Sequence, residues 1–408
     1  MRLISNGSER DLMITTDVFI AGAGLAGSIA ALSYAKSARN VVVADPFSYD
    51  ESSKFDYRTT AYLQPSKLFL ELLGVWDFVK DSAMPLDVMK IIDASGKGDP
   101  GEIKSEKNFN SSEFSDLPFG WNVKNSLMRT TLQSLIERQS NCKLITGTRA
   151  VDFISRDDAA YVKLSSGKTV KAKLVIAADG RNSVLRKKAG ISVKTHNFAQ
   201  KALAFAVTHS IPHKNVSTEI HLSGGPFTLV PLQDHYGKPS SAVVWMDKSE
   251  KAAKLIDMKD KEFEKEMTQR SCSILGPLKL ASKRSLWPII SQIADRIYSQ
   301  RLALIGETAH VVPPIGAQGL NMSLADIKIL SELDKQYPDD LGSTYSLNEY
   351  QKNRIADIRK RVVGVSTLNH ISISENKVVQ NIRAFGLENF FQVPAVKNQA
   401  MKLGLGYS

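Results

Sequence analysis

A chain of 408 residues with 43% apolar and 23% charged side chains has the composition of a soluble globular protein of two or three domains. Its two cysteines, Cys142 and Cys272, form neither a disulfide framework nor a Cys-x-x-Cys zinc motif, so a reducing cytoplasm is expected. The net charge of +11 comes without an aromatic-interleaved basic strand or a recognition-helix pattern, which argues against nucleic acid as a partner.

A short apolar strand and a glycine-rich turn begin the ordered pattern of the chain. Glycines stand at Gly22, Gly24 and Gly27, before a helix of small residues and a second strand at 41–44 that ends at Asp45. A dinucleotide fold requires this order, because the glycines permit a tight turn close to the pyrophosphate and the acid binds ribose hydroxyls. We therefore predict that a nucleotide contacts Gly22, Gly24, Leu25, Ala26, Gly27 and Asp45.

The pattern is weaker after the second strand. A helix is predicted at 59–73, a strand at 86–94, and a polar loop with at most one short strand at 95–118. Clear periodicity returns with an amphipathic helix at 125–140, in which Arg129 lies beside the apolar face.

The middle of the chain is rich in strands. Four follow the amphipathic helix, and the last of them ends in an Asp179-Gly180 turn. Short β-rich runs then dominate and predict a mostly antiparallel sheet. The strands are predicted at 143–145, 151–155, 161–164, 169–178, 202–208, 219–222, 227–232, 242–245 and 285–289, with helices at 249–257 and 259–270 before the last strand.

The stretch from Gly306 to Asn321 carries the most chemistry. A buried strand at 302–305 leads into a loop with two prolines and two glycines, and an apolar-periodic helix begins at about Asn321. A helix N-terminus behind Gly-x-x-Gly is an anion site, because its first amides lack intrahelical partners and the helix dipole adds positive charge. Together with the N-terminal glycine turn, this stretch indicates an FAD site on which the two ends of the chain converge.

Three motifs resemble those of one family. The sequence from Gly306 to Asp326, Gly-Glu-Thr-Ala-His-x-x-x-Pro-x-x-x-Gln-Gly-Leu-Asn-x-x-x-x-Asp, resembles the motif of FAD-dependent aromatic hydroxylases, the class A flavoprotein monooxygenases, and most of all that of the ubiquinone-biosynthesis hydroxylases. The Asp-Gly-x-x-Ser-x-x-Arg sequence from Asp179 and the Gly-Pro-x-x-x-x-Pro-Leu strand from Gly225 are similar to two further family motifs. The likeness covers nearly the whole chain, but Glu307 stands where the family usually has Asp.

The resemblance implies an α/β fold of the glutathione-reductase type, like that of para-hydroxybenzoate hydroxylase. A Rossmann-like FAD-binding domain would be interleaved with a mostly antiparallel substrate sheet and followed by C-terminal helices. The expected division is 1–85, 120–190 and 300–345 for the FAD-binding domain, 86–119 and 191–299 for the substrate sheet, and 346–408 for the helical region.

The resemblance also implies the chemistry. NAD(P)H reduces FAD, O2 adds to the reduced flavin as a C4a-hydroperoxide, and the aromatic ring of a polyprenylated phenol in ubiquinone biosynthesis is hydroxylated. A small soluble phenol is the alternative substrate. A flavin-binding scaffold of a ubiquinone-biosynthesis complex is the alternative to catalysis, and Glu307 is its only support.

The implied site has two parts, and neither includes a metal. The loop that faces the flavin ring contains Pro314, Gly316, Gln318 and Gly319, with no side chain assigned as acid or base. Further cofactor contacts are implied for Arg58, Arg129, Asp179, Gly306, Glu307, Gly319, Leu320 and Asn321. Two alternatives stay open: Arg58 could instead form a surface salt bridge with Asp56, and His310 could act in acid–base or metal chemistry instead of supporting the loop.

The C-terminal region is basic. Between residues 351 and 408, nine Lys and Arg side chains face three acidic ones, on predicted helices at 346–368 and 376–387. They form either a solvated helix face or a surface that docks on an anionic membrane or an acidic partner. The uncharged run at 18–35 contains three glycines in a turn spacing, so no membrane span is expected and association would be peripheral. The cations expected to dock are Arg359, Lys360 and Arg361.

Overall fold

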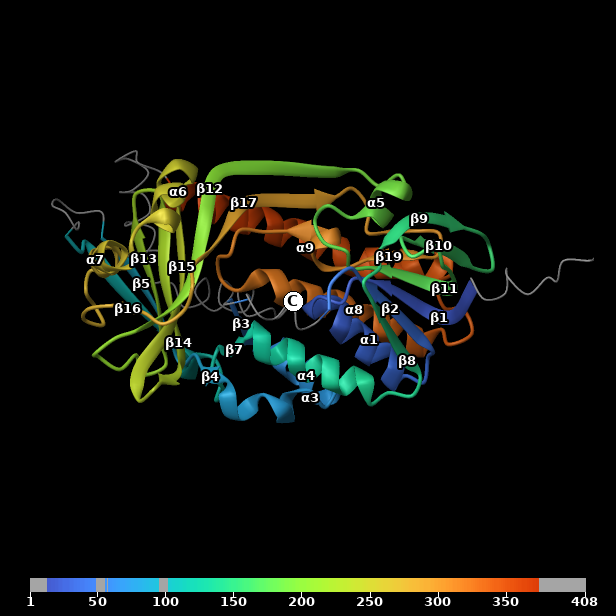
Figure 1. Ribbon diagram of the computed structural model, residues 1–408, viewed down its shortest axis with the longest axis horizontal. Helices are drawn as coiled ribbons and strands as arrows, with labels where there is room; N and C mark the ends of the chain where they lie inside the picture. The colour runs from blue at the N-terminus through green and yellow to red at the C-terminus, as the bar shows by residue number, and fades with distance from the viewer. Residues whose placement is uncertain (1–12, 49–55, 57, 95–101, 374–408) are drawn as a thin grey trace, which may run out of the picture.

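The computed structural model describes residues 13–48, 56, 58–94 and 102–373, which form an α/β structure with three sheets. Figure 1 shows the two large sheets in opposite halves of an elongated molecule, with helix α8 (Gln318–Gln336) between them. The predicted helix at 376–387 lies outside the described residues. The predicted division into domains stays a prediction.

The first sheet is mainly parallel. Its central strand β1 ends in a run of apolar residues that are buried without alternation, as in a parallel strand that is covered on both faces. Five parallel strands form its centre in the order β8 (Cys142–Thr146), β2 (Val41–Asp45), β1 (Met13–Ala21), β11 (Thr169–Ala177) and β19 (Leu302–Leu304). Antiparallel strands extend it, namely β18 (Tyr298–Ser299), β10 (Ala160–Leu164) and β9 (Ala150–Ser155).

The second sheet confirms the mostly antiparallel prediction for the middle of the chain. Of its pairings, only the one between β13 and β5 is parallel within the described residues. The order is β20 (His310–Val311), β17 (Ser285–Ala294), β12 (Val193–Thr208), β15 (Lys238–Lys248), β14 (Gly225–His235), β13 (Val216–Leu222), β5 (Val88–Asp93) and β6 (Ser105–Asn110), with β16 (Lys279–Leu280) beside β12. Helices α6 (Ser249–Asp257) and α7 (Asp260–Arg270) follow β15.

Strands β12 and β17 connect the two halves. They pair from Val193 with Ala294 to Ala204 with Ser285, and Figure 1 shows both running from one half of the molecule to the other. The sequence predicted only the C-terminal part of β12, residues 202–208, and the N-terminal part of β17, residues 285–289. The first seven residues of β12 are mostly exposed and polar, so they lack the alternation that indicates a half-buried strand.

Helices cover the first sheet and join it to the second. Helix α1 (Leu25–Lys36) packs against α4 (Asn125–Glu137) and α8, and α9 (Thr344–Ile373) contacts α8 and strands β14 and β17. The buried Tyr350 of α9 donates a hydrogen bond to the carbonyl oxygen of Leu304 at 2.8 Å, which ties α9 to the end of β19. Short helical segments complete the fold: α5 (Val184–Lys188), η2 (Trp76–Phe78), η3 (Lys80–Ser82), η4 (Ser111–Glu113) and η5 (Gly306–Thr308).

The predicted helix at 59–73 is wrong over its first five residues. They form strand β3 (Thr59–Leu63), which pairs with β7 (Gly120–Lys124) in a small sheet that also contains β4 (Met84–Pro85). β-Branched and aromatic residues favour this strand, and helix α3 (Gln64–Leu72) begins only where Pro65 occupies its first turn. Helix α8 also begins three residues earlier than expected, at Gln318.

Candidate FAD site

The N-terminal glycine turn is tightly packed at two of its three glycines. Gly22 has a φ of +99°, and a Cβ there would lie 2.4 Å from the carbonyl oxygen of Ala178. A Cβ on Gly27 would lie 1.9 Å from the carbonyl oxygen of Gly22. At Gly24, by contrast, no other described atom lies within 4 Å of an added Cβ. The space in front of Gly24 therefore allows a ligand to approach the backbone, as a pyrophosphate does in a dinucleotide fold.

Asp45 lies across the same turn. Its carboxylate accepts hydrogen bonds from the backbone amides of Ala23, at 2.7 Å, and Phe47, at 2.9 Å. Each carboxylate oxygen has a further lone pair, so the group can also accept hydrogen bonds from ribose hydroxyls. The predicted acid thus stands at the carboxyl end of β2, beside the glycines, where this fold places nucleotides.

The C-terminal motif begins against the same turn. An added Cβ on Gly306 would lie 3.6 Å from the Cβ of Ala26 in α1 and 3.0 Å from the hydroxyl of Ser323 in α8. The backbone amide of Gly306 donates to Asp326 at 3.1 Å. Two segments about 280 residues apart in sequence therefore meet at the start of η5, as the sequence predicted.

The loop before α8 turns its residues alternately inward and outward. Pro313, Ile315 and Gln318 are buried, whereas Gly316 and Gly319, like Pro314, are exposed. Gly316 and Ala317 are both left-handed, with φ of +63° and +55°. For alanine this conformation costs roughly 1–2 kcal/mol, so other contacts must hold it.

Side-chain amides hold this left-handed turn. Gln318 donates from Nε2 to the carbonyl oxygen of Gly316 at 2.8 Å, and Asn321 donates from Nδ2 to that of Ala317 at 2.6 Å. Asn321 also donates to the carbonyl of Ala61 and accepts from the amide of Leu63, so its side chain ties α8 to β3. The side-chain amide of Asn321 is therefore already engaged by the protein, and its predicted cofactor contact stays a prediction.

Helices α1 and α8 both begin without a capping side chain in the described structure. Neither has an acidic residue in its first turn, and their N-caps are Gly24 and Ala317. The first amides of each helix lack intrahelical acceptors and carry the positive end of the helix dipole. Both helix ends therefore suit electron-rich groups, α1 a pyrophosphate and α8 the pyrimidine edge of a flavin.

Charged side chains lie between the two sheets. Arg58 forms the salt bridge with Asp56 that was the alternative to its cofactor contact, at 2.7 Å, and its guanidinium also lies 5.1 Å from the ring centre of Trp287 in β17. The cofactor contact of Arg58 stays a prediction. Burial alone would lower the pKa of Arg58, but the pairing with Asp56 and then the charge of the exposed Glu307 raise it. Arg129 lies 3.5 Å from Asp56. The atom that faces Asp56 is the buried Nε, which makes no hydrogen bond in the described structure and can therefore donate one to a polar group of a bound cofactor.

The motif that begins at Asp179 has a structural role in the described residues. Asp179 accepts from the amide of Val184 at 2.8 Å and from the hydroxyl of Thr308 at 3.4 Å. The buried Arg186 donates to the carbonyl oxygens of Thr308 and Arg181. The motif therefore fixes η5 against α5, and a cofactor contact of Asp179 stays a prediction.

His310 belongs to a buried charged cluster. Its Nε2 lies 2.7 Å from Asp326, which also binds Nε of Arg354 at 2.9 Å. Burial would raise the pKa of Asp326, but the charges and hydrogen bonds of His310 and Arg354 lower it. No group of three metal-binding side chains occurs in the described part of the chain. The contacts support the structural role of His310.

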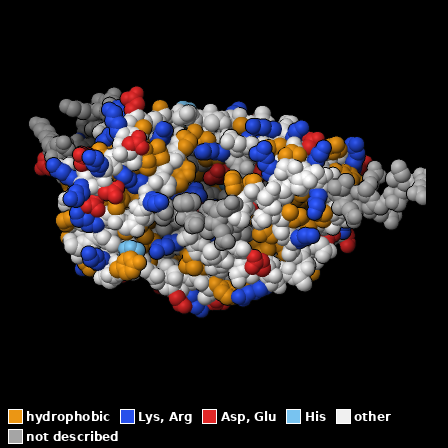
Figure 2. All heavy atoms as spheres, in the orientation of Figure 1, with side chains coloured by type: hydrophobic (Ala, Val, Ile, Leu, Met, Phe, Trp, Pro, Cys, Tyr) orange, Lys and Arg blue, Asp and Glu red, His pale blue; other side chains and the backbone are white. Residues whose placement is uncertain are grey.

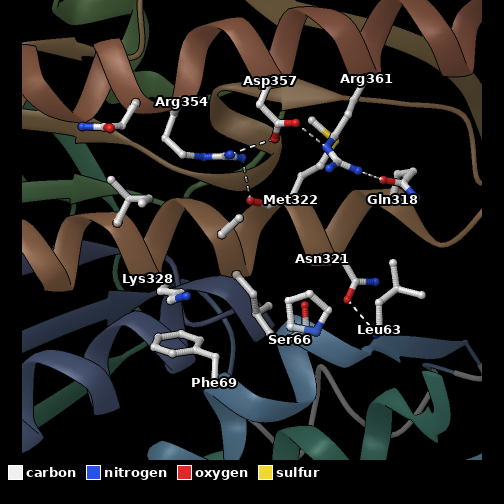
Figure 3. A pocket seen from close by; sticks show the side chains of 15 residues that line it. Leu63, Ser66, Phe69, Gln318, Asn321, Met322, Lys328, Arg354, Asp357 and Arg361 are labelled. Atoms are coloured by element: carbon white, nitrogen blue, oxygen red, sulfur yellow. Dashed lines mark hydrogen bonds and ion pairs between the residues drawn. The ribbon is translucent and has the colours of Figure 1, made fainter. Parts of the chain in front are cut away.

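Helix α9 contributes residues to the site that no sequence motif indicated. Arg354 binds Asp357 at 2.8 Å, Asp357 binds Nε of Arg361 at 2.8 Å, and Nη1 of Arg361 donates to Oε1 of Gln318 at 2.6 Å (Figure 3). These residues line a cavity of ≈ 200 Å³, whose opposite wall includes Phe69. Their spacing of three and four residues on one helix was the only signal in the sequence.

Arg361 was wrongly expected among the membrane-docking cations. Its side chain is only 11% exposed and is engaged by Asp357 and Gln318, because it faces α8. Its neighbours Arg359 and Lys360 are exposed. The basic run therefore contains one side chain that packs against α8, that of Arg361, and two that face solvent, those of Arg359 and Lys360.

The FAD binding domain family matches residues 15–362. The chain belongs to this family. It is 29% identical over 346 residues to the ubiquinone hydroxylase UbiL of Rhodospirillum rubrum, covering 84% of this chain and 78% of that protein. It is 27% identical over 401 residues to the 3-demethoxyubiquinol 3-hydroxylase of Escherichia coli, covering 96% and 98%. The p-nitrophenol 4-monooxygenase of Pseudomonas putida has the same fold, with a TM-score of 0.76, 19% identity and coverage of 96% and 98%.

Membership of this family confirms three predictions: the FAD cofactor, the α/β monooxygenase fold and the kinship with FAD-dependent hydroxylases. The site fits FAD, because it has an open glycine cradle and two uncapped helix ends, and because the buried Nε of Arg129 makes no hydrogen bond among the described residues. The individual cofactor contacts stay predictions. No helix in the described ranges has the length and apolar character of a membrane span.

Proposed function

We propose that this protein uses FAD, NAD(P)H and O2 to hydroxylate the aromatic ring of a polyprenylated phenol in ubiquinone biosynthesis. The relatives that are named as hydroxylases of ubiquinone or its precursors support the substrate class, since one of them matches over 96% of this chain. FAD, when bound, supplies the redox and oxygen chemistry. The chain binds the cofactor, orients the substrate and excludes water.

The observation that carries this proposal is an apolar cluster between the flavin loop and the second sheet. Ile315 of the loop packs there, with Val312 at its edge, next to Val365 of α9. An apolar, closed environment protects oxygen chemistry on a flavin from water and suits an apolar substrate. The sheet contributes Phe198, Ala202, Met246 and Ile289.

Hydroxylation can be tested with purified protein, NAD(P)H and isotopically labelled O2. Phenols with polyprenyl tails of several lengths should gain one labelled oxygen atom, measured by mass spectrometry, and catalytic efficiency should rise with tail length. Equal efficiency with a tail-free phenol would favour a small soluble substrate. NAD(P)H oxidation without any hydroxylated product would contradict the proposal and favour a scaffold.

The cofactor should be released by acid. No His or Cys lies in a motif that suggests a covalent flavin linkage, and Nε2 of the buried His310 is bound to Asp326. After acid precipitation, the yellow colour should stay in the supernatant. Flavin that remains on the pellet would contradict non-covalent binding.

We also propose that the protein is cytoplasmic and docks reversibly on an anionic membrane. A polyprenyl tail is insoluble in water, so the enzyme must meet the bilayer or receive its substrate from a partner such as a ubiquinone-biosynthesis complex. The exposed Arg359 and Lys360 on α9, with Val363 nearby at 65% exposure, support docking. Figure 2 shows Lys and Arg spread over both halves of the visible face, so the positive charge in that view forms no single patch.

A further inference from the structure

Charged side chains of α9 and α8 connect the two ends of the flavin loop. His310 at the start of the loop binds Asp326, and Gln318 at its end binds Arg361. Arg354 binds Asp326, and Asp357 binds both Arg354 and Arg361, so the two contacts belong to one continuous row. Figure 3 shows the part of this row from Arg354 to Gln318. One connected set of hydrogen bonds and ion pairs therefore reaches both ends of the loop.

The contact at Gln318 has a defined direction. A guanidinium can only donate hydrogen bonds, so Arg361 requires the Oε1 side of the Gln318 amide to face it. The Nε2 side then faces the carbonyl oxygen of Gly316, to which it donates at 2.8 Å. This bond holds the left-handed turn at Gly316 and Ala317, directly before the first amides of α8, which lack intrahelical acceptors as in any helix.

We propose that Arg361 is a positioning residue for the flavin loop. It orients the side-chain amide of Gln318, which holds the turn that presents the N-terminus of α8 to FAD. Asp357 in turn holds Arg361, through Nε at 2.8 Å. The inference rests on the proposed function only in that the loop faces the flavin ring, and it adds the residue on α9 that controls the loop.

The first test measures FAD binding to apoprotein by flavin fluorescence, together with the visible spectrum of the bound flavin. Arg361→Gln should weaken FAD binding roughly tenfold, the size expected for a lost hydrogen bond to a charged group, and should shift the flavin bands. Arg361→Lys should recover only part of the affinity. The ammonium keeps the charge and can donate hydrogen bonds, but it cannot bind Asp357 and Gln318 with the planar geometry of a guanidinium. Lys360→Gln is the matched control, since Lys360 is exposed on the same turn of α9, and it should match the wild type.

A double-mutant cycle separates positioning from plain stability. If Arg361 acts through Gln318, the double variant with Gln318→Ala and Arg361→Gln should lose no more FAD affinity than the worse single variant. Fully additive losses would overturn the proposal. So would an Arg361→Gln protein with the affinity and spectrum of Lys360→Gln.

A second variant covers the case in which Arg361→Gln does not fold. Gln318→Glu keeps an acceptor for Arg361 but removes the donor to Gly316, so it should fold, bind FAD more weakly and show shifted flavin bands. A wild-type affinity and spectrum in this variant would refute the role of the Gln318 amide. None of these measurements needs the phenol. They therefore test the role of Arg361 even if the protein does not hydroxylate a phenol.

Discussion

The two glycine-containing turns of the FAD site are held in different ways. At the N-terminal turn, the backbone itself leaves no room for side chains, because a Cβ on Gly22 or Gly27 would meet a carbonyl oxygen within 2.4 Å. At the C-terminal loop, distant side chains hold the backbone: Asp326 binds the amide of Gly306, and Arg361 orients Gln318. The first turn depends on close contacts between backbones, within the turn and with Ala178 after β11, whereas the second depends on side-chain partners from α8 and α9.

This difference explains which parts of the site tolerate change. A sterically closed turn should fail at the substituted residue itself. A loop held by distant charged side chains should also fail when one of those side chains is changed. Five predictions test this contrast, beginning with the largest expected effect.

Removal of the charge on Asp326 should have the largest effect. Asp326→Asn keeps the size of the side chain but replaces one carboxylate oxygen by an NH2 group, which cannot accept a hydrogen bond. That group would face either Arg354, or His310 and the amide of Gly306. Breaking such a buried pair should lower the free energy of unfolding by about 3–5 kcal/mol, measured by urea denaturation near neutral pH. An unchanged urea midpoint and slope would show that the cluster does not stabilise the loop.

The same variant should change the acid stability. Because the pKa of Asp326 is lowered in the folded protein, its contribution is complete above the usual value of 3.8 and is lost as the pH falls towards the folded pKa. The difference in stability between the wild type and Asp326→Asn should therefore shrink below about pH 4. A constant difference across this range would contradict the lowered pKa.

Valine substitutions at two glycines of the N-terminal turn should separate an effect on stability from an effect on FAD binding. In Gly27→Val the new side chain overlaps the carbonyl oxygen of Gly22, so the protein should lose about 1–3 kcal/mol of stability or more. In Gly24→Val the side chain enters open space, so the apoprotein should melt like the wild type but retain little FAD. Melting temperature and flavin content are the measurements. Wild-type flavin content in Gly24→Val would overturn the placement of the pyrophosphate.

Glu307 should affect binding and leave the fold unchanged. It is exposed on η5, close enough to raise the pKa of Arg58, and it is expected to accept a hydrogen bond from a ribityl hydroxyl. Glu307→Ala should weaken FAD binding by ~1.5–3 kcal/mol, and Glu307→Asp should be milder. Fluorescence titration of the three apoproteins is the measurement, and equal affinities would show that Glu307 points elsewhere.

The smallest effect concerns the exposed cations of α9. Each cation near an anionic surface contributes ~1 kcal/mol, so Arg359→Gln with Lys360→Gln should reduce sedimentation with anionic liposomes at low salt. FAD content should stay unchanged, unlike that of Arg361→Gln on the same helix. Equal liposome binding by the wild type and the double variant would leave Arg359 and Lys360 as a solvated surface.

The sequence by itself determined the features that depend on local geometry. The spacing of Gly22, Gly24 and Gly27 before Asp45 specifies a strand, a tight turn and a helix, because glycines at these positions permit the turn and the close approach of a pyrophosphate. The short β-rich runs between 202 and 245 likewise predicted the antiparallel sheet. The motif from Gly306 to Asp326 identified the second half of the FAD site.

Only the tertiary structure decided the features that depend on distant partners. Thr59–Leu63 becomes a strand because β7 pairs with it, and Asn321 is engaged because β3 lies beside α8. Arg361 and Arg359 look alike in a basic run, yet only Arg361 faces α8 and binds Gln318. Sequence spacing records which residues share a helix face, whereas the neighbour of that face is set by the packing of the whole chain.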